Sequence, residues 1–116
     1  MPIMRFKGFE RERIKTLAPL IIDGMHEVAN VPKENVKIEL LHVEAITKSP
    51  QYVEILMFER EQEQHDAVAA MLHHLLCRHG FEQVHIFFIR LTPSLYYKGG
   101  TPLNQIPMAK KPIGTP

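Results

Sequence analysis

The first half of the chain alternates a short run suited to a strand with a longer stripe suited to a helix. Apolar and basic residues alternate over Ile3–Lys7 and the run stops at Gly8, which predicts a strand that opens the domain. Apolar residues then recur at helical spacing from position 14 to 28, which predicts a helix behind a solvated first turn. Pro19 lacks a backbone donor, so we expect either a kink there or a helix that begins only a few residues before it.

The remaining elements complete two similar halves. Val36–Val43 is rich in branched apolar residues and predicts a second strand, which ends in the loop through Lys48 and Pro50. A strand, a helix that stops at Gly80 and a closing strand then follow at Tyr52–Phe58, Gln62–Arg78 and Val84–Leu91. The sequence therefore predicts an α/β (α+β) fold, in which two β-α-β units form a four-stranded mixed sheet with two helices on one face.

The closing strand is apolar on both faces. Alternate residues point to opposite sides of a sheet, here Val84, Ile86 and Phe88 against Phe87, Ile89 and Leu91. Two helices on one side would leave an apolar face that a monomer rarely exposes, so we expect a homo-oligomer. Residues 38–42 mix apolar and polar side chains. The alternative is therefore a ferredoxin-like monomer in which the uncovered face of the sheet is polar.

Length and composition set the domain organisation. The chain has 116 residues, enough for one domain, which we place at residues 1–100. Residues 101–116 are rich in proline with little apolar pattern, and we expect an extended or disordered tail that could lie across a neighbouring subunit.

Charge and targeting signals narrow the class of partner. The 14 basic and 13 acidic residues are interspersed, so neither nucleic acid nor a membrane surface is an expected partner. No run approaches the ~20 apolar residues of a membrane span, and the N-terminus lacks the pattern of a signal peptide. A single cysteine, Cys77, lies on the apolar stripe of the second helix, where we expect core packing in a reducing compartment. These features predict a cytoplasmic protein.

The order of these elements resembles one known superfamily. Pro2-Ile3 opening a strand, a turn through Gly8, a helix, a strand near Lys37, and a second strand-helix-strand ending in an aromatic hairpin are similar to the tautomerase and macrophage migration inhibitory factor (MIF) superfamily. The runs VEILMFEREQEQHDAVA and LTPSLYYKGG look most similar to an uncharacterised bacterial branch, a domain of unknown function. The resemblance covers about residues 2 to 100 and implies a homotrimer whose three sheets surround a central channel.

The resemblance also implies a role for Pro2. A free α-amine has a reference pKa near ~8, and a desolvated apolar pocket disfavours its charged form, so a terminal amine can be a neutral base near pH 7. Such a base interconverts keto and enol forms without a metal or organic cofactor. Met1 must first be removed, because the amide nitrogen of a Met-Pro bond is not basic. The alternative is that Pro2 only stiffens the start of an edge strand.

The resemblance also implies which positions of this sequence would bind a substrate. The resemblance places a basic pocket residue on or beside Lys33, and the end of the third strand brings Phe58 and Arg60 near the pocket floor. His85 and Tyr97 would come from an adjacent subunit and face the substrate oxygen. A solvated surface charge is the simpler interpretation of Lys33 and Arg60, and of Arg11, one of two arginines that the family's first-helix arginine could match.

This sequence departs from the family pattern in its fourth strand. Better-known members carry tyrosine and asparagine there, where this chain has His85 and Phe87, so the set of donors differs and substrate identity does not carry over. His73 and Cys77 lie four apart, but no further zinc pattern supports a metal site. Two functions stay open: a tautomerase with Pro2 as base, or a non-catalytic trimer of the same fold that binds a small ligand or a protein.

Overall fold

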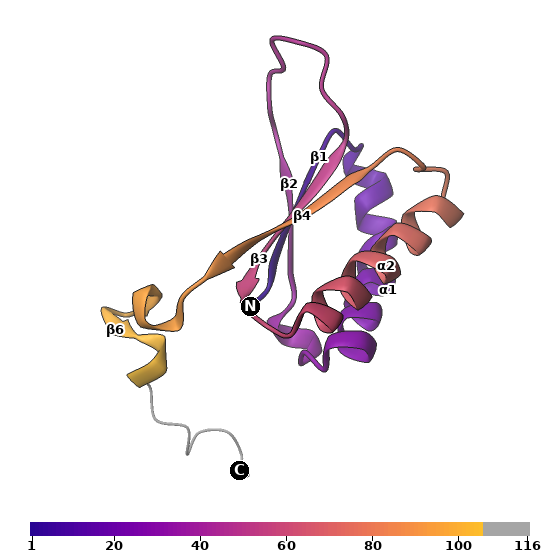
Figure 1. Cartoon of the computed structure of the whole chain (residues 1–116). Coiled ribbons are helices and arrows are strands. Elements are labelled where there is room, and N and C mark those ends of the chain that lie inside the picture. The colour runs from indigo at the N-terminus through magenta and orange to yellow at the C-terminus, as the bar shows by residue number, and fades with distance from the viewer. Residues whose placement is uncertain (106–116) are drawn as a thin grey trace.

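The chain forms two layers, a four-stranded sheet and a pair of helices on one of its faces (Figure 1). The computed structural model describes residues 1–105. The strands of the sheet are β1 (Ile3–Lys7), β2 (Lys37–Leu41), β3 (Tyr52–Phe58) and β4 (His85–Leu91), and the helices are α1 (Arg11–Ala29) and α2 (Gln62–Arg78). Short 3-10 turns lie at Lys33–Asn35, Pro93–Leu95 and Leu103–Gln105, and a small hairpin pairs β5 (Tyr97–Lys98) with β6 (Thr101–Pro102).

The sheet has the topology expected of two β-α-β units. Its strand order is β2-β1-β3-β4, with β1 parallel to β2, β3 parallel to β4, and the two pairs antiparallel to each other. The predicted four-stranded mixed sheet with two helices on one face is therefore confirmed. The first strand, third strand and second helix have the predicted bounds, because each has an undisturbed period of two or 3.6 residues.

Helix α1 runs without interruption through Pro19. The expectation that it begins only a few residues before Pro19 is wrong, since it begins at Arg11. Pro19 lies on the exposed side, where its missing N–H leaves the carbonyl group of Lys15 to solvent. The apolar stripe on the opposite side is buried, and its packing outweighs the local preference of proline.

The core fills the space between the helices and the covered face of the sheet. Alternate strand residues face it, as on β3, where Val53, Ile55 and Met57 are buried. Helix α2 contributes Leu72 and three other buried residues. Cys77, expected in this core, is only half-buried, because it lies at the edge of the stripe, where its Sγ is 3.5 Å from Nε2 of His73. No helix within residues 1–105 combines the length and apolar character needed to cross a membrane.

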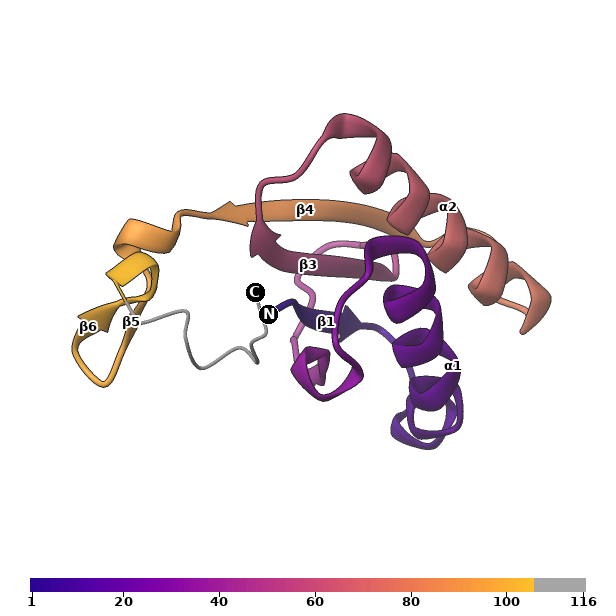
Figure 2. The ribbon, with the colours of Figure 1, turned by 90° about the horizontal axis from the view of Figure 1, so that it is seen from below.

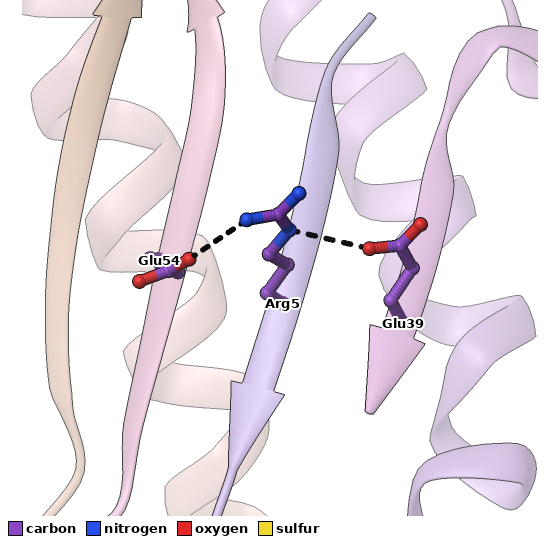
Figure 3. Close-up of polar contacts among 3 residues, drawn as sticks. All are labelled: Arg5, Glu39 and Glu54. Atoms are coloured by element: carbon purple, nitrogen blue, oxygen red, sulfur yellow. Dashed lines mark hydrogen bonds and ion pairs between the residues drawn. The ribbon is translucent and has the colours of Figure 1, made fainter. Parts of the chain in front are cut away.

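The other face of the sheet carries no helix and has two kinds of surface. The register aligns Ile3, Leu56 and Ile89 in one apolar row across three strands. The next row is charged: Arg5 Nε lies 3.2 Å from Glu39 Oε1 and Arg5 Nη1 lies 3.4 Å from Glu54 Oε1 (Figure 3). The bare face is therefore part apolar, as expected for an oligomer, and part polar, as in the alternative.

The chain after β4 forms an arm, residues 92–105, that projects beyond the end of that strand (Figures 1 and 2). Its hairpin turns at Gly99 and Gly100, whose φ values of 60° and 82° suit glycine. The arm returns toward the sheet at Tyr96, whose ring packs edge-on against Phe58 with centroids 5.8 Å apart. The tail expected from residue 101 thus begins inside this hairpin, and its residues 106–116 lie outside the described part of the chain.

Candidate functional site

A hollow of about 570 Å³ lies where the N-terminus meets the arm. The sheet supplies Met1 and Ile3 from the start of β1, Lys37 from β2 and Phe58 from the end of β3. The arm supplies the other side, with Tyr96, Tyr97, Lys98 and Leu103. The hollow therefore joins four segments of one chain that are far apart in sequence.

The strand register explains why the N-terminus and Lys37 meet. Ile3 is the first residue of β1 and pairs with Lys37, so the two side chains share the bare face of the sheet. One residue earlier, the carbonyl oxygen of Pro2 accepts a hydrogen bond from the backbone N–H of Lys37 over 3.0 Å. The Lys37 Nζ donates to the carbonyl oxygen of Glu34 at 2.9 Å. This cation is thereby held beside the beginning of the chain.

The hollow changes the acidity of the amine inside it. Burial lowers the pKa of the Met1 α-amine below its ordinary value, and the nearby charges of Lys37 and Lys98 lower it further. The Met1 amine is therefore more often neutral near pH 7 than an ordinary α-amine.

Pro2 lies directly behind Met1. It is less than 2% exposed, and its nitrogen is part of the Met1-Pro2 amide. Because Met1 lines the hollow, removal of that residue would open space beside the Pro2 nitrogen. While Met1 is in place, the Pro2 nitrogen is an amide nitrogen and is not basic.

Two of the predicted substrate-binding residues, Phe58 and Tyr97, line this hollow. Tyr97, which the resemblance assigns to an adjacent subunit, lines this hollow from the arm of the same chain. Lys33 lies elsewhere, with its Nζ 3.1 Å from Oδ1 of Asp23, both side chains being exposed. Lys37, four residues later and the first residue of β2, lies beside the Met1 amine instead.

Arg60 contacts the C-terminal end of α1. Its Nη1 donates to the carbonyl oxygen of Ala29, and its backbone N–H donates to Nε2 of His65. It lines a separate hollow of about 650 Å³ at the start of α2, together with Phe88 and Arg90. In this arrangement Arg60 ties the end of one helix to the start of the other.

His85 lies at the opposite end of the sheet from Met1. It begins β4 and pairs with Tyr52, which in turn pairs with Lys7 at the far end of β1. Arg11 lines a shallow hollow between α1 and β2. Within a single chain neither residue lines the hollow at the N-terminus.

Lys37 and Lys98 were not predicted as site residues from the sequence. For Lys37 the signal was present, because alternation along β2 places it on the same face as Ile3 once the two strands are paired. For Lys98 it was absent, since its position depends on how the arm folds back. His73 and Cys77 are in contact, but within residues 1–105 no three side chains of metal-binding type gather.

Several solved structures have the same fold as this chain. A protein of unknown function from Vibrio cholerae O1 biovar eltor superimposes with a TM-score of 0.80 at 22% identity, covering 87% of this chain and 86% of that one. A domain of unknown function from Sebaldella termitidis gives 0.78 at 24% identity, with 87% and 98% covered. The wild-type asymmetric trimer of F6 fused 4-OT, a tautomerase-fold protein, gives 0.74 at 14% identity, with 88% and 96% covered.

These likenesses confirm the tautomerase-like fold expected from the sequence. No curated protein matches the chain. The family described as "Domain of unknown function (DUF1904)" matches residues 1–102, which is most of the chain. The chain therefore belongs to the DUF1904 family, a branch with the tautomerase-like fold.

Proposed function

We propose that this chain is a cofactor-independent tautomerase of small keto or unsaturated carboxylic acids, with Pro2 as the general base after removal of Met1. The observation that carries the proposal is the hollow at the N-terminus, where burial and two lysines lower the pKa of the Met1 amine, one residue from the Pro2 nitrogen. A base that is neutral near pH 7, and whose conjugate acid can return a proton, is what keto-enol interconversion requires.

The reaction moves one proton and needs no other reactant. The Pro2 nitrogen accepts the hydroxyl proton of an enol and becomes a secondary ammonium group beside the enolate. That ammonium group then donates the proton to the neighbouring carbon, which gives the keto acid and restores the neutral amine. Lys37 binds the substrate carboxylate, and the hydroxyl group of Tyr97 donates to the enolate oxygen.

The ring of Phe58 forms an apolar wall of the hollow and limits the access of water to the amine. We assign the carboxylate to Lys37 in place of Lys33 and Arg60, which interact with Asp23 and Ala29. His85 belongs to the proposal only as a residue of a neighbouring subunit.

The proposal includes a cytoplasmic homotrimer. Ile89 and Phe87 are each 40% exposed on the bare face of the sheet, and burial of their apolar surface would favour association. F6 fused 4-OT, which has the same fold, is an asymmetric trimer. This supports a trimer of the present chain over a dimer.

A second function stays open, a non-catalytic oligomer that binds a small ligand or a partner protein in the same hollow. The full burial of Pro2 behind Met1 favours it for any chain that keeps its methionine. The two functions differ in whether the terminal nitrogen takes part in chemistry.

The test compares three forms of the protein on enol-to-keto conversion of an aryl pyruvate. These are the trimmed chain, with loss of Met1 established by intact mass, the variant Pro2→Ala, and a chain with an uncleaved N-terminal extension. General-base catalysis typically contributes ~10²–10⁴-fold, so the extended chain should lose at least about a hundredfold in rate. Pro2→Ala keeps a primary amine and should retain part of the rate. Equal rates in the trimmed and extended chains would contradict the proposal and favour the binding function.

A further inference from the structure

A second hollow, at the start of α2, is separate from the one at the N-terminus. Its volume of about 650 Å³ is within the size range of small-molecule sites. Its walls are the turn between β3 and α2, the first turn of α2 and the end of β4. The two hollows share no lining residue, so a ligand could occupy one without contact with the other.

One wall of this second hollow is a pair of aromatic rings. The ring of His65 packs edge-on against Phe88, with centroids 4.5 Å apart. Nε2 of His65 accepts a hydrogen bond from the backbone N–H of Arg60 over 3.1 Å, so the ring hydrogen is on Nδ1. Nδ1 is buried and has no hydrogen-bond partner within residues 1–105. The wall therefore combines apolar surface with a polar atom whose bonding capacity is unused.

Two charged side chains of this hollow lack an oppositely charged partner in the described part of the chain. The Arg60 guanidinium group donates to the backbone carbonyl of Ala29 and has further N–H donors. Glu61 takes part in none of the four ion pairs of residues 1–105, and its side chain makes no cap hydrogen bond at the start of α2. Arg90 and Glu59, by contrast, neutralise each other at 3.1 Å. One positive and one negative group are thus available on consecutive residues.

An α-amino acid has the complementary charges. Its carboxylate and ammonium groups are attached to one carbon atom, just as the two available partners are on adjacent residues. The carboxylate can accept charge-assisted hydrogen bonds from Arg60, and the ammonium group can donate to Glu61. An acid without an ammonium group would meet Glu61 as a like charge, and an amine without a carboxylate would meet Arg60 in the same way. The aromatic wall then accommodates an apolar side chain.

We propose that this hollow binds a free α-amino acid with an apolar or aromatic side chain. Its carboxylate is on Arg60, its ammonium group is on Glu61, and its side chain packs against Phe88. The amino acid is bound and not transformed. The inference does not rest on the proposed function, because the second hollow contains neither the terminal nitrogen nor any residue beside it.

The test is an NMR titration of the full chain with phenylalanine and with two analogues that each lack one charge. Hydrocinnamate lacks the ammonium group, and phenethylamine lacks the carboxylate. One exposed ion pair contributes up to about fivefold in affinity, so each analogue should bind about three- to fivefold more weakly than phenylalanine. Alanine lacks the ring and should bind at least about fivefold more weakly. The amide shifts that change should be those of residues 59–65.

Glu61→Gln should bind phenylalanine about three- to fivefold more weakly, while its affinity for hydrocinnamate does not fall. Glu63→Gln is the matched control, since Glu63 is an exposed glutamate in the first turn of the same helix but does not line the hollow. It should keep the full affinity. Both side chains are exposed, so neither substitution disturbs the core.

Equal affinities for phenylalanine and hydrocinnamate in the unmodified protein would overturn the inference, and so would equal effects of the two glutamate substitutions. Shifts confined to the start of β1 would place the ligand in the other hollow and would overturn it as well. An uncleaved N-terminal extension should leave the affinity for phenylalanine unchanged. The amino-acid site therefore stands or fails separately from the proposed base.

Discussion

The backbone N–H of Lys37 donates to the carbonyl oxygen of Pro2 over 3.0 Å. The bond ties the second strand to the residue just before β1, so the direction of the chain at its N-terminus is set by backbone pairing. The side chain of Lys37 is not needed for it. Position and charge at this site can therefore be separated: replacement of the lysine side chain changes the charge beside the amine and leaves the amine in place.

Ile89→Asp should weaken assembly while a single subunit still folds. Ile89 is 40% exposed on the bare face, and a charge there would be desolvated against a second copy. Sedimentation at micromolar concentration should show a trimer for the unmodified chain and a smaller species for the variant, with unchanged far-UV circular dichroism.

Leu20→Asp is the matched control for this charge. Leu20 is an apolar residue of similar exposure, 42%, but it lies on α1, on the other side of the molecule. It should leave the sedimentation coefficient unchanged. A monomeric unmodified chain, or equal effects of the two substitutions, would rule out the bare face as the interface.

Arg5→Met should lower stability more than Glu39→Gln. Loss of the guanidinium group leaves Glu54, whose side chain is only 15% exposed, without its cation (Figure 3). We expect a loss of about 1–2 kcal/mol in the free energy of unfolding. Glu39 is 53% exposed, and its pair with Arg5 should contribute below about 1 kcal/mol. Urea denaturation at one fixed protein concentration measures both, and an equal loss for the two variants would refute this ranking.

Arg60→Met should affect stability and leave turnover unchanged. Its guanidinium group donates to the carbonyl oxygen of Ala29, at the end of α1, so its loss should cost about 1–2 kcal/mol. Arg90→Met, which breaks an exposed pair with Glu59, is the control and should change stability by less than about 1 kcal/mol. A large fall in kcat for Arg60→Met would contradict this structural role. It would support the position at the pocket floor that the sequence resemblance implies for Arg60.

Pro19→Ala should stabilise the protein. Proline in the interior of a helix is about 3 kcal/mol less favourable than alanine, and Pro19 is exposed, so its removal leaves no cavity. We expect a gain of roughly 1–3 kcal/mol by urea denaturation. Thr16→Ala, a change on the exposed side of the same helix, should shift stability by only a few tenths of a kcal/mol. A loss of stability in Pro19→Ala would mean that the proline has a packing role.

The fold could be predicted from the sequence because its elements are strongly periodic. The strand at Tyr52–Phe58 and the helix at Gln62–Arg78 have the predicted bounds, since alternation and helical spacing there are uninterrupted. The start of α1 was harder to predict, because proline disfavours a helix interior locally. The burial of the apolar stripe outweighs that preference, and the helix runs through Pro19.

The candidate site was less predictable, since it depends on which distant residues meet. Motif matching pointed to Lys33, but only the pairing of β1 with β2 shows that Lys37 is the lysine beside the N-terminus. Lys98 could not be found from periodicity, because the arm has no apolar stripe that fixes its direction. Phe58 was found, because it is the last residue of a well-defined strand.

The central claim, that a terminal amine in this hollow is the base, is tested most directly by the pH dependence of kcat/KM in the trimmed chain. The activity should fall on the acidic side, with an apparent pKa below the value of about 8 for an ordinary α-amine. Lys37→Gln removes a positive charge that disfavours the ammonium form, so the apparent pKa should rise and the activity should be lost at a higher pH than in the unmodified chain. A profile without an acidic limb, or a limb that stays in place in Lys37→Gln, would contradict the account.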